Sequence, residues 1–124
     1  MALTDLLTRN DHVIAAGGLF AVKGGYYQAT LAAGVTLDNT YPTLIGLDPG
    51  GSTRIVLLDA ESLANQGLFR IIYNRADAAE NLTVKDAAAA TIGTVSQNEI
   101  GVFYMDSVAA GWVLVALIDA VSLS

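Results

Sequence analysis

The chain has 124 residues, of which 53% are hydrophobic and 15% are charged, and it contains no cysteine. This length suits one domain, and the high apolar content excludes an intrinsically disordered chain. The absence of cysteine excludes disulfide scaffolds, thiolate metal sites and thiol nucleophiles. The 12 acidic residues outnumber the 6 basic ones, which argues against a protein that coats nucleic acid.

The apolar segments are too short to cross a membrane. The longest uninterrupted run is Trp112–Ile118, whereas a spanning helix needs ~20 residues. A second segment, Val13–Val22, resembles a signal-peptide core, but the acidic residues Asp5 and Asp11 precede it, where signal peptides carry net positive charge. We therefore expect a soluble chain without a membrane partner, folded as a single domain over residues 1–124.

The beginning of the chain is predicted to differ from the rest. In residues 1–11, Leu3, Leu6 and Leu7 have helical spacing and Thr4 is a possible N-cap, which indicates one of two elements. It is either a short helical turn on the protein's own sheet or an N-terminal arm that becomes ordered on a neighbour. Strands are predicted after it, on both sides of a Gly-Gly turn. These first predicted strands span residues 18–23, 26–32 and 43–47.

The remainder predicts a succession of short strands. Turn signals such as Asp48–Gly51 separate segments that are rich in Val, Ile, Thr, Phe and Tyr. Alternation along one segment predicts that Phe69, Ile71 and Tyr73 share one face of their strand. The predicted strands of this region span residues 53–59, 68–74, 81–85, 91–95, 99–106 and 112–118.

About eight strands with almost no helix predict an all-β protein. Double-sheet arrangements protect strand edges, so we expect a jelly-roll-like β-sandwich. The middles of two strands, Ile55–Leu58 and Val113–Leu117, are apolar on both faces, whereas a sandwich strand normally turns one face to water. We expect their outer faces to be covered by copies of the chain or by a partner. The mean hydropathy of +0.50 fits this arrangement or, alternatively, an alanine-rich core.

No group of residues predicts catalysis. The chain has one histidine, His12, so a histidine metal site is excluded and any Ser-His-Asp triad would have to use it. Ser52 lacks the second glycine of a nucleophile elbow. The glycines of Gly18–Gly24 lack the Lys-Ser/Thr pair of a phosphate-binding loop. We therefore expect neither an enzyme nor a cofactor site.

Acidic residues were the remaining candidates for chemistry. Asp77 and Glu80 share a loop, and Asp59 and Glu61 flank a turn, but neither pair has the spacing of a calcium-binding loop. Arg75 near Asp77 is typical of a surface ion pair. We expect no metal site, with a weak cation site at one of these turns as the alternative.

Tyrosines and leucines are the candidates for contacts with a partner. Tyr26 and Tyr27 are adjacent in a predicted strand, and adjacent strand residues face opposite sides, so one of them should point outward. The aromatic residues could form a sugar-binding platform, although aromatics within strands are more typical of a core or a subunit contact. The candidate partner-contact residues are Leu3, Leu6, Leu7, Tyr26 and Tyr27.

Several strings in the second half of the chain resemble a known class of proteins. They are Phe69–Asp86, Thr91–Thr94, Glu99–Tyr104 and Gly111–Trp112. They are similar to strings in small β-rich virion proteins of tailed bacteriophages, most of all in head decoration (cement) proteins. Similar strings occur in tail-fibre and tailspike-associated β domains. Ala87–Ala90 departs from this pattern, which would have a glycine- or aspartate-rich turn there.

The resemblance implies a jelly-roll-like subunit that forms a homotrimer on the outer surface of an icosahedral head. Such a protein is made in the host cytoplasm and clamps neighbouring major capsid proteins in the virion. Its partners would be the major capsid protein and itself, without nucleic acid or membrane. The alternative is a receptor- or glycan-binding β module of a tail fibre or baseplate.

Overall fold

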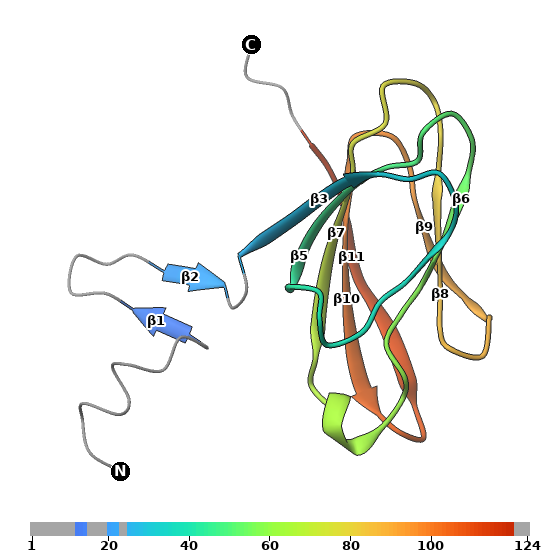
Figure 1. Ribbon diagram of the computed structural model, residues 1–124. Coiled ribbons are helices and arrows are strands. Elements are labelled where there is room, and N and C mark those ends of the chain that lie inside the picture. Colours follow the sequence, from blue (N-terminus) through green and yellow to red (C-terminus); the bar gives the residue numbers. More distant parts are fainter. Residues whose placement is uncertain (1–11, 15–19, 23–24, 121–124) are drawn as a thin grey trace.

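The computed structural model describes residues 12–14, 20–22 and 25–120, and it contains nine strands in two sheets that pack together (Figure 1). The order of strands is β11-β10-β7-β5-β3 in the five-stranded sheet and β4-β6-β8-β9 in the four-stranded sheet. The five-stranded sheet comprises β3 (Tyr26–Thr30), β5 (Leu44–Asp48), β7 (Phe69–Asn74), β10 (Glu99–Ser107) and β11 (Gly111–Asp119). The four-stranded sheet comprises β4 (Val35–Thr36), β6 (Arg54–Leu57), β8 (Leu82–Lys85) and β9 (Thr91–Val95).

Three short elements complete the described chain. β1 (His12–Ile14) and β2 (Phe20–Val22) pair antiparallel as a separate two-stranded sheet. A single 3-10 turn, η1 (Leu63–Asn65), lies between β6 and β7. Among the described residues, no helix has the length and apolar character needed to cross a membrane.

From β3 to β8, each successive strand lies in the sheet opposite its predecessor. Because the chain returns to the same sheet in the same direction, β3, β5 and β7 run parallel, as do β4, β6 and β8. The pairings β7–β10, β10–β11 and β8–β9 are antiparallel. A jelly roll joins antiparallel strands in Greek keys, so the jelly-roll-like order expected from the sequence is not shown.

The core fills the space between the two sheets. Alternate residues of the central strands point into it, as strand geometry requires, and each buried aliphatic side chain stabilises the fold by about 1.5–3 kcal/mol. The buried apolar residues are Leu37, Ile45, Leu47, Val56, Leu58, Ile72, Leu82, Val84, Val95, Phe103, Met105 and Trp112.

The predicted all-β class and the two packed sheets are confirmed. Each predicted strand overlaps an observed one, but two observed strands, β1 and β4, were not predicted. They have three and two residues, which is too short for alternation to show. The N-terminal arm or helical turn expected at residues 1–11 lies outside the described residues.

The turn between β8 and β9 contains four alanines, although the resemblance implies a glycine- or aspartate-rich turn there. The carboxylate of Asp86 accepts hydrogen bonds from the backbone N–H groups of Ala88 and Ala90, at 3.0 and 2.8 Å. Ala89 adopts φ +69°, a left-handed conformation that favours glycine. The aspartate that precedes the four alanines therefore stabilises their turn.

Candidate interaction surface

β7, the central strand of the five-stranded sheet, places two polar side chains inward on either side of the buried Ile72. Arg70 and Asn74 are buried between the sheets, with exposed fractions of 1% and 0%. Phe69, Ile71 and Tyr73 alternate with them on the outer side. The prediction that these three residues share a face agrees with the structure, but their face is directed away from the core.

The pairing of neighbouring strands extends this outer side into three rows across the sheet. The middle row, from β3 to β11, consists of Tyr26, Leu44, Ile71, Val102 and Ala116. One flanking row contributes Tyr73, Ile100 and Ile118, and the other contributes Phe69, Tyr104 and Val113. We call these residues the outer apolar face.

The outer apolar face is open to solvent in the described structure. Tyr26 and Phe69 are each 46% exposed, Val113 is 40% exposed and Ile118 is 53% exposed. The three rows contain no charged side chain, but the side chain of Arg75 lies at their margin, beside Gly46 and Tyr26. With ~4.8 Å between strands and ~7 Å between alternate residues, the eleven residues of these rows have a footprint of roughly 370 Å². The largest apolar patch of a soluble monomer typically covers about 300–600 Å² and is often functional.

The apolar surface continues onto the edge of the sheet at β11. This strand pairs with β10 on one side and with no described strand on the other. Val115 and Leu117 are 56% and 42% exposed, and Val115 lies at a register shift, where Leu114 and Ala116 pair with consecutive residues of β10. The predicted two-sided apolar segment Val113–Leu117 therefore lies where a partner can reach both the face and the edge.

The outer face of the four-stranded sheet is more polar. Thr83 of β8 pairs with Ile55 of β6 and with Thr94 of β9, and Lys85 lies on the same side of β8. Ile55 is 44% exposed, but these hydroxyl and ammonium groups lie around it. The predicted two-sided segment Ile55–Leu58 therefore exposes a small apolar spot, and this outer face is compatible with contact to water.

Polar groups lie at one end of the outer apolar face, next to an aromatic pair. The rings of Phe69 and Tyr104 lie with their centroids 5.5 Å apart. The hydroxyl of Tyr104 donates a hydrogen bond to Asp106. This hydrogen bond, together with desolvation and the charge of Asp106, raises the pKa of Tyr104 above the usual tyrosine value. Tyr104 is therefore neutral at physiological pH, and the charge at this end of the face is that of the Asp106 carboxylate.

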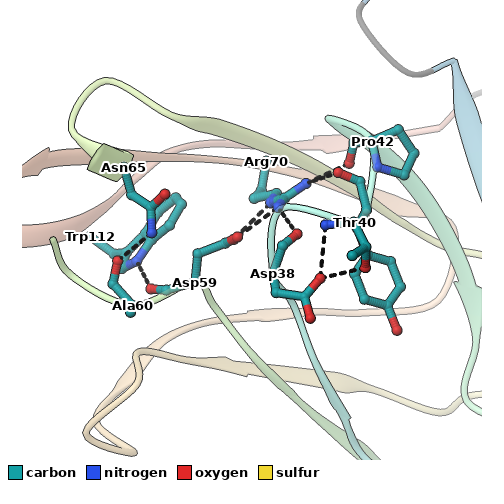
Figure 2. Close-up of polar contacts among 9 residues, drawn as sticks. Asp38, Thr40, Pro42, Asp59, Ala60, Asn65, Arg70 and Trp112 are labelled. Carbon is teal, nitrogen blue, oxygen red and sulfur yellow. Dashed lines mark hydrogen bonds and ion pairs between the residues drawn. The ribbon is translucent and has the colours of Figure 1, made fainter. Parts of the chain in front are cut away.

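On the inner face of the same sheet, Arg70 forms a fully paired polar cluster (Figure 2). Its guanidinium group makes a bidentate ion pair with Asp59, at 2.8 and 2.7 Å. Its other N–H groups donate to the backbone carbonyls of Asp38, Tyr41 and Pro42, at 2.7, 3.0 and 2.6 Å. All five N–H donors of the guanidinium are used, so Arg70 has no donor left for a ligand. Its hydrogen bonds connect the preceding loops to β7.

The same polar cluster includes the indole of Trp112. Its Nε1–H donates to the backbone carbonyl of Asp59 at 2.9 Å, and the side chain of Asn65 donates to the carbonyl of Ala60 at 2.7 Å (Figure 2). A surface cleft lies beside this cluster, and Arg70 is its one charged lining residue among those described. Because the donors of Arg70 are already used, the cleft offers no ionic group to a ligand.

Asn74 is the second polar residue that the sequence interpretation missed on the inner face. Its amide nitrogen donates to the carbonyls of Glu80 and Val95 at 2.8 and 2.9 Å, and its oxygen accepts from the N–H of Ala76 at 2.9 Å. The sequence signal is the even spacing of Arg70 and Asn74 within an apolar strand. Buried polar side chains need hydrogen-bond partners. Arg70 and Asn74 are both buried and both have such partners, so we assign them a structural role.

Three acidic residues come together in the described structure. Asp48, Asp77 and Glu80 each place a carboxylate oxygen within 4.8 Å of the others. The backbone N–H groups of Gly50 and Gly51 donate to Asp48 and Glu80, at 2.9 and 3.0 Å. The sequence interpretation grouped Asp77 with Glu80 but not with Asp48. These contacts hold Asp48 and Glu80 in place, and we assign the cluster no ligand.

Two polar pairs expected from the sequence are not formed. Arg75 and Asp77 make no ion pair in the described part of the chain, where the arginine that pairs with an acid is Arg70. Asp59 and Glu61 flank a turn but have different neighbours, since Asp59 pairs with Arg70 and Glu61 lies against Gly111. Sequence proximity does not show the direction of these side chains.

The candidate contact residues are not gathered at one place. Tyr26 belongs to the outer apolar face, whereas Tyr27 is on the opposite side of β3, where its ring packs edge-to-face on Tyr41 with 5.1 Å between centroids. Both tyrosines are exposed on this edge strand, Tyr26 at 46% on the outer side and Tyr27 at 38% on the opposite side. The candidates that lie outside the described residues are Leu3, Leu6 and Leu7.

No protein-family model matches the chain, and no curated protein matches its sequence. The outer apolar face is the surface of the described structure whose composition departs most from an ordinary solvated surface. It is therefore our candidate functional site.

Proposed function

We propose that this protein is a structural component of a bacteriophage virion. In this proposal it binds the outside of an icosahedral head as a homotrimer and stabilises contacts between major capsid proteins. The observation that carries the proposal is the outer apolar face, whose three rows are partly exposed and hold no charged side chain. The resemblance of the segments around β7, β8 and β10 to head decoration proteins supplies the class of partner.

The chemistry of such a role is the burial of apolar surface. At about 25 cal/mol per Å², a footprint of roughly 370 Å² corresponds to on the order of 10 kcal/mol before the costs of association and ordering. Three linked subunits would engage several capsid proteins at once, so that weak individual contacts combine through a high effective concentration. This mechanism needs no catalytic group, cofactor or metal.

The N-terminal segment is part of the proposal as a second contact with the head. In this role Leu3, Leu6 and Leu7 would anchor an arm on a neighbouring capsid protein. Deletion of residues 2–11 should then weaken binding to heads while the sandwich stays folded. Head binding that is unchanged by the deletion would exclude the arm.

Binding to heads tests the proposed function. Purified protein would be mixed with empty heads of the phage that encodes it, assembled without this protein, and the heads would be sedimented. We expect saturable binding in a fixed ratio to the major capsid protein, and heads that withstand higher temperature or chaotrope concentration. The absence of binding, with a protein shown to be folded, would overturn the proposal.

One feature of the described structure favours the alternative, a receptor- or glycan-binding module of a tail fibre or baseplate. Phe69 and Tyr104 form an aromatic pair with Asp106 beside it, and aromatic rings with a nearby carboxylate are suited to a sugar ring. A glycan-array screen with wild-type protein and the Tyr104→Ala variant separates the two functions. Binding that is lost in the variant would favour the glycan-binding function.

A further inference from the structure

We infer that the hairpin of β1 and β2 in one copy of the chain pairs with the free edge of β11 in the next copy. Three such contacts close the proposed homotrimer into a ring. This inference rests on the proposed function and deepens it, because it names the contact between copies. The outer apolar face is left free for the capsid protein.

The free edge of β11 is the sheet edge best suited to an added strand among those described. β11 has nine residues, and its one charged residue, Asp119, lies at its end. The other edge strands are shorter, with five residues in β3, five in β9 and two in β4. Edge strands are usually protected by short length, charged side chains or proline. The unpaired backbone N–H and C=O groups of an unprotected edge are matched by one kind of partner, another extended strand.

The register shift at Val115 determines which part of this edge is available. After the shift, residues 116–119 pair regularly with β10. Leu117 and Ile118 in this stretch are 42% and 53% exposed. The stretch is long enough for a strand of three residues, which is the length of β1 and of β2.

The hairpin of β1 and β2 needs a partner of this kind. The two strands pair with each other and, among the described strands, with no other, not even with β3, which follows them directly (Figure 1). A two-stranded hairpin by itself is at best marginally stable in water. The sequences of the strands, His-Val-Ile and Phe-Ala-Val, are largely apolar, as is the edge of β11.

The length of the chain excludes the hairpin from the β11 edge of its own subunit. Residues 23–25 connect β2 to β3, and a fully extended chain places Val22 at most ~14 Å from Tyr26. β3 and β11 are the two edges of the five-stranded sheet. At ~4.8 Å per strand, a strand added beyond β11 lies roughly 24 Å from β3. The hairpin can therefore pair with β11 only in another copy.

Such a contact joins two different surfaces, the hairpin of one copy and the β11 edge of the next. Head-to-tail contacts between different surfaces close into rings, and a ring of three is the homotrimer of the proposed function. Pairing of one surface with itself would give a dimer instead.

Cross-linking of introduced thiols tests the contact, because the chain contains no cysteine. The test variant carries Ala21→Cys in β2 and Leu117→Cys in β11. The matched control carries Ala21→Cys and Thr94→Cys, which is an exposed position of β9 in the other sheet. Each variant would be treated with a short bismaleimide and separated by denaturing electrophoresis, with circular dichroism as the check of folding.

We expect covalent products of two and three chains from the test variant, and single chains from the control. A folded test variant that yields no more multi-chain product than the control would overturn the inference, as would a cross-link formed within one chain.

A charge on the edge provides a second test. Leu117→Lys introduces the kind of side chain that protects natural edges, at a position that is already exposed. By light scattering, wild type should have three times the mass of 12.9 kDa, and the folded variant should fall to the mass of one chain. A variant that keeps the wild-type mass would contradict the inference.

Head binding distinguishes this inference from the proposed function. A trimer that is cross-linked through β2 and β11 but never binds heads supports the contact between copies and overturns the capsid role. A wild type that binds heads but gives no cross-link between β2 and β11 overturns the contact and leaves the capsid role intact.

Discussion

The inner and outer faces of the five-stranded sheet reverse the usual distribution of polar and apolar side chains along its central strand. On the inner face of β7, Arg70 and Asn74 are buried, and every polar group has a partner. On the outer face, Phe69, Ile71 and Tyr73 are apolar or aromatic and partly exposed. The comparison teaches that burial in this fold is decided by polar pairing as well as by hydrophobicity, and that the exposed apolar side is available for another protein.

The four-stranded sheet provides the reference for this comparison. Its inner face is purely aliphatic at Val56, Leu82, Val84 and Val95, and its outer face carries threonines and a lysine. This is the distribution expected for a sandwich strand with one face in water. The unusual surface is therefore a property of one sheet, not of the chain's composition as a whole.

Breaking the buried ion pair should give the largest effect. Arg70→Met leaves Asp59 buried without its partner, and we expect a loss of about 3–5 kcal/mol in the free energy of unfolding. Arg54→Met is the control, because Arg54 is half-buried and donates to a single carbonyl, that of Pro49; its loss should be about 1 kcal/mol. Chemical denaturation measures both. Equal losses in the two variants would show that the polar cluster contributes no special stability.

Adjacent isoleucines of β7 sharpen the comparison between the two faces. Ile72 is fully buried and Ile71 is partly exposed on the outer side. We expect Ile72→Ala to cost about 2–5 kcal/mol, and Ile71→Ala to cost less than half as much. Ile71→Ala should instead weaken binding to heads. Denaturation and sedimentation with heads measure the two effects, and a larger loss of stability from Ile71→Ala would contradict the assigned faces.

Two glycines give a similar pair with a smaller effect. A Cβ at Gly101 would lie 2.7 Å from Phe103 and 2.8 Å from Val95, both fully buried, so Gly101→Ala should cost about 1–3 kcal/mol through overpacking. A Cβ at Gly46 would meet the hydroxyl end of Tyr26 and the side chain of Arg75 on the outer side, and both of these side chains can move. Gly46→Ala should therefore cost less. The melting temperatures of the two variants measure this difference. Equal destabilisation would show that Tyr26 is held rigidly.

The smallest effect concerns the margin of the outer face. The pKa of Tyr104 is raised by its hydrogen bond to Asp106, so the associated stabilisation is present at neutral pH and is lost as the pH rises through the folded-state pKa. Asp106→Asn should lower the pKa of Tyr104 toward the usual value, because it removes the acceptor charge. The difference between the ultraviolet titration curves of wild type and variant, with Tyr104→Phe identifying the residue, measures the shift. Identical curves would exclude the hydrogen bond in solution.

The sequence was sufficient to predict the strands but not their partners. Alternation and turn residues identify β7, β8 and β9 because these features are local along the chain. The parallel pairing of β3 with β5 and of β5 with β7 depends on how the chain crosses between sheets, which a hydrophobic pattern does not encode. This is the physical reason that the jelly-roll-like order did not follow from a good prediction of strands.

The sequence predicted an apolar surface in the candidate site, but it did not predict which strands that surface covers. The two-sided apolar segment Val113–Leu117 indicated a covered surface, and it does lie at the edge of the outer apolar face. The rest of that face requires the register of five strands. Alternation along β7 does not show which of its two sides faces the core. The side that carries Arg70 is buried because Arg70 pairs with Asp59, in the loop after β6. Contacts between distant segments are visible only once the chain has folded.

The central claim is that the outer apolar face is covered when the protein binds a head. Because the chain contains no cysteine, one introduced thiol reports on one position. Val113→Cys lies on the outer apolar face, and Thr94→Cys lies on the outer face of the four-stranded sheet; both positions are exposed in the single chain.

The rate of thiol labelling in free protein and in protein bound to empty heads is the most direct measurement. We predict that Cys at position 113 reacts rapidly in free protein and slowly on heads, whereas Cys at position 94 reacts rapidly in both. Labelling at position 113 that is as fast on heads as in free protein would contradict the claim.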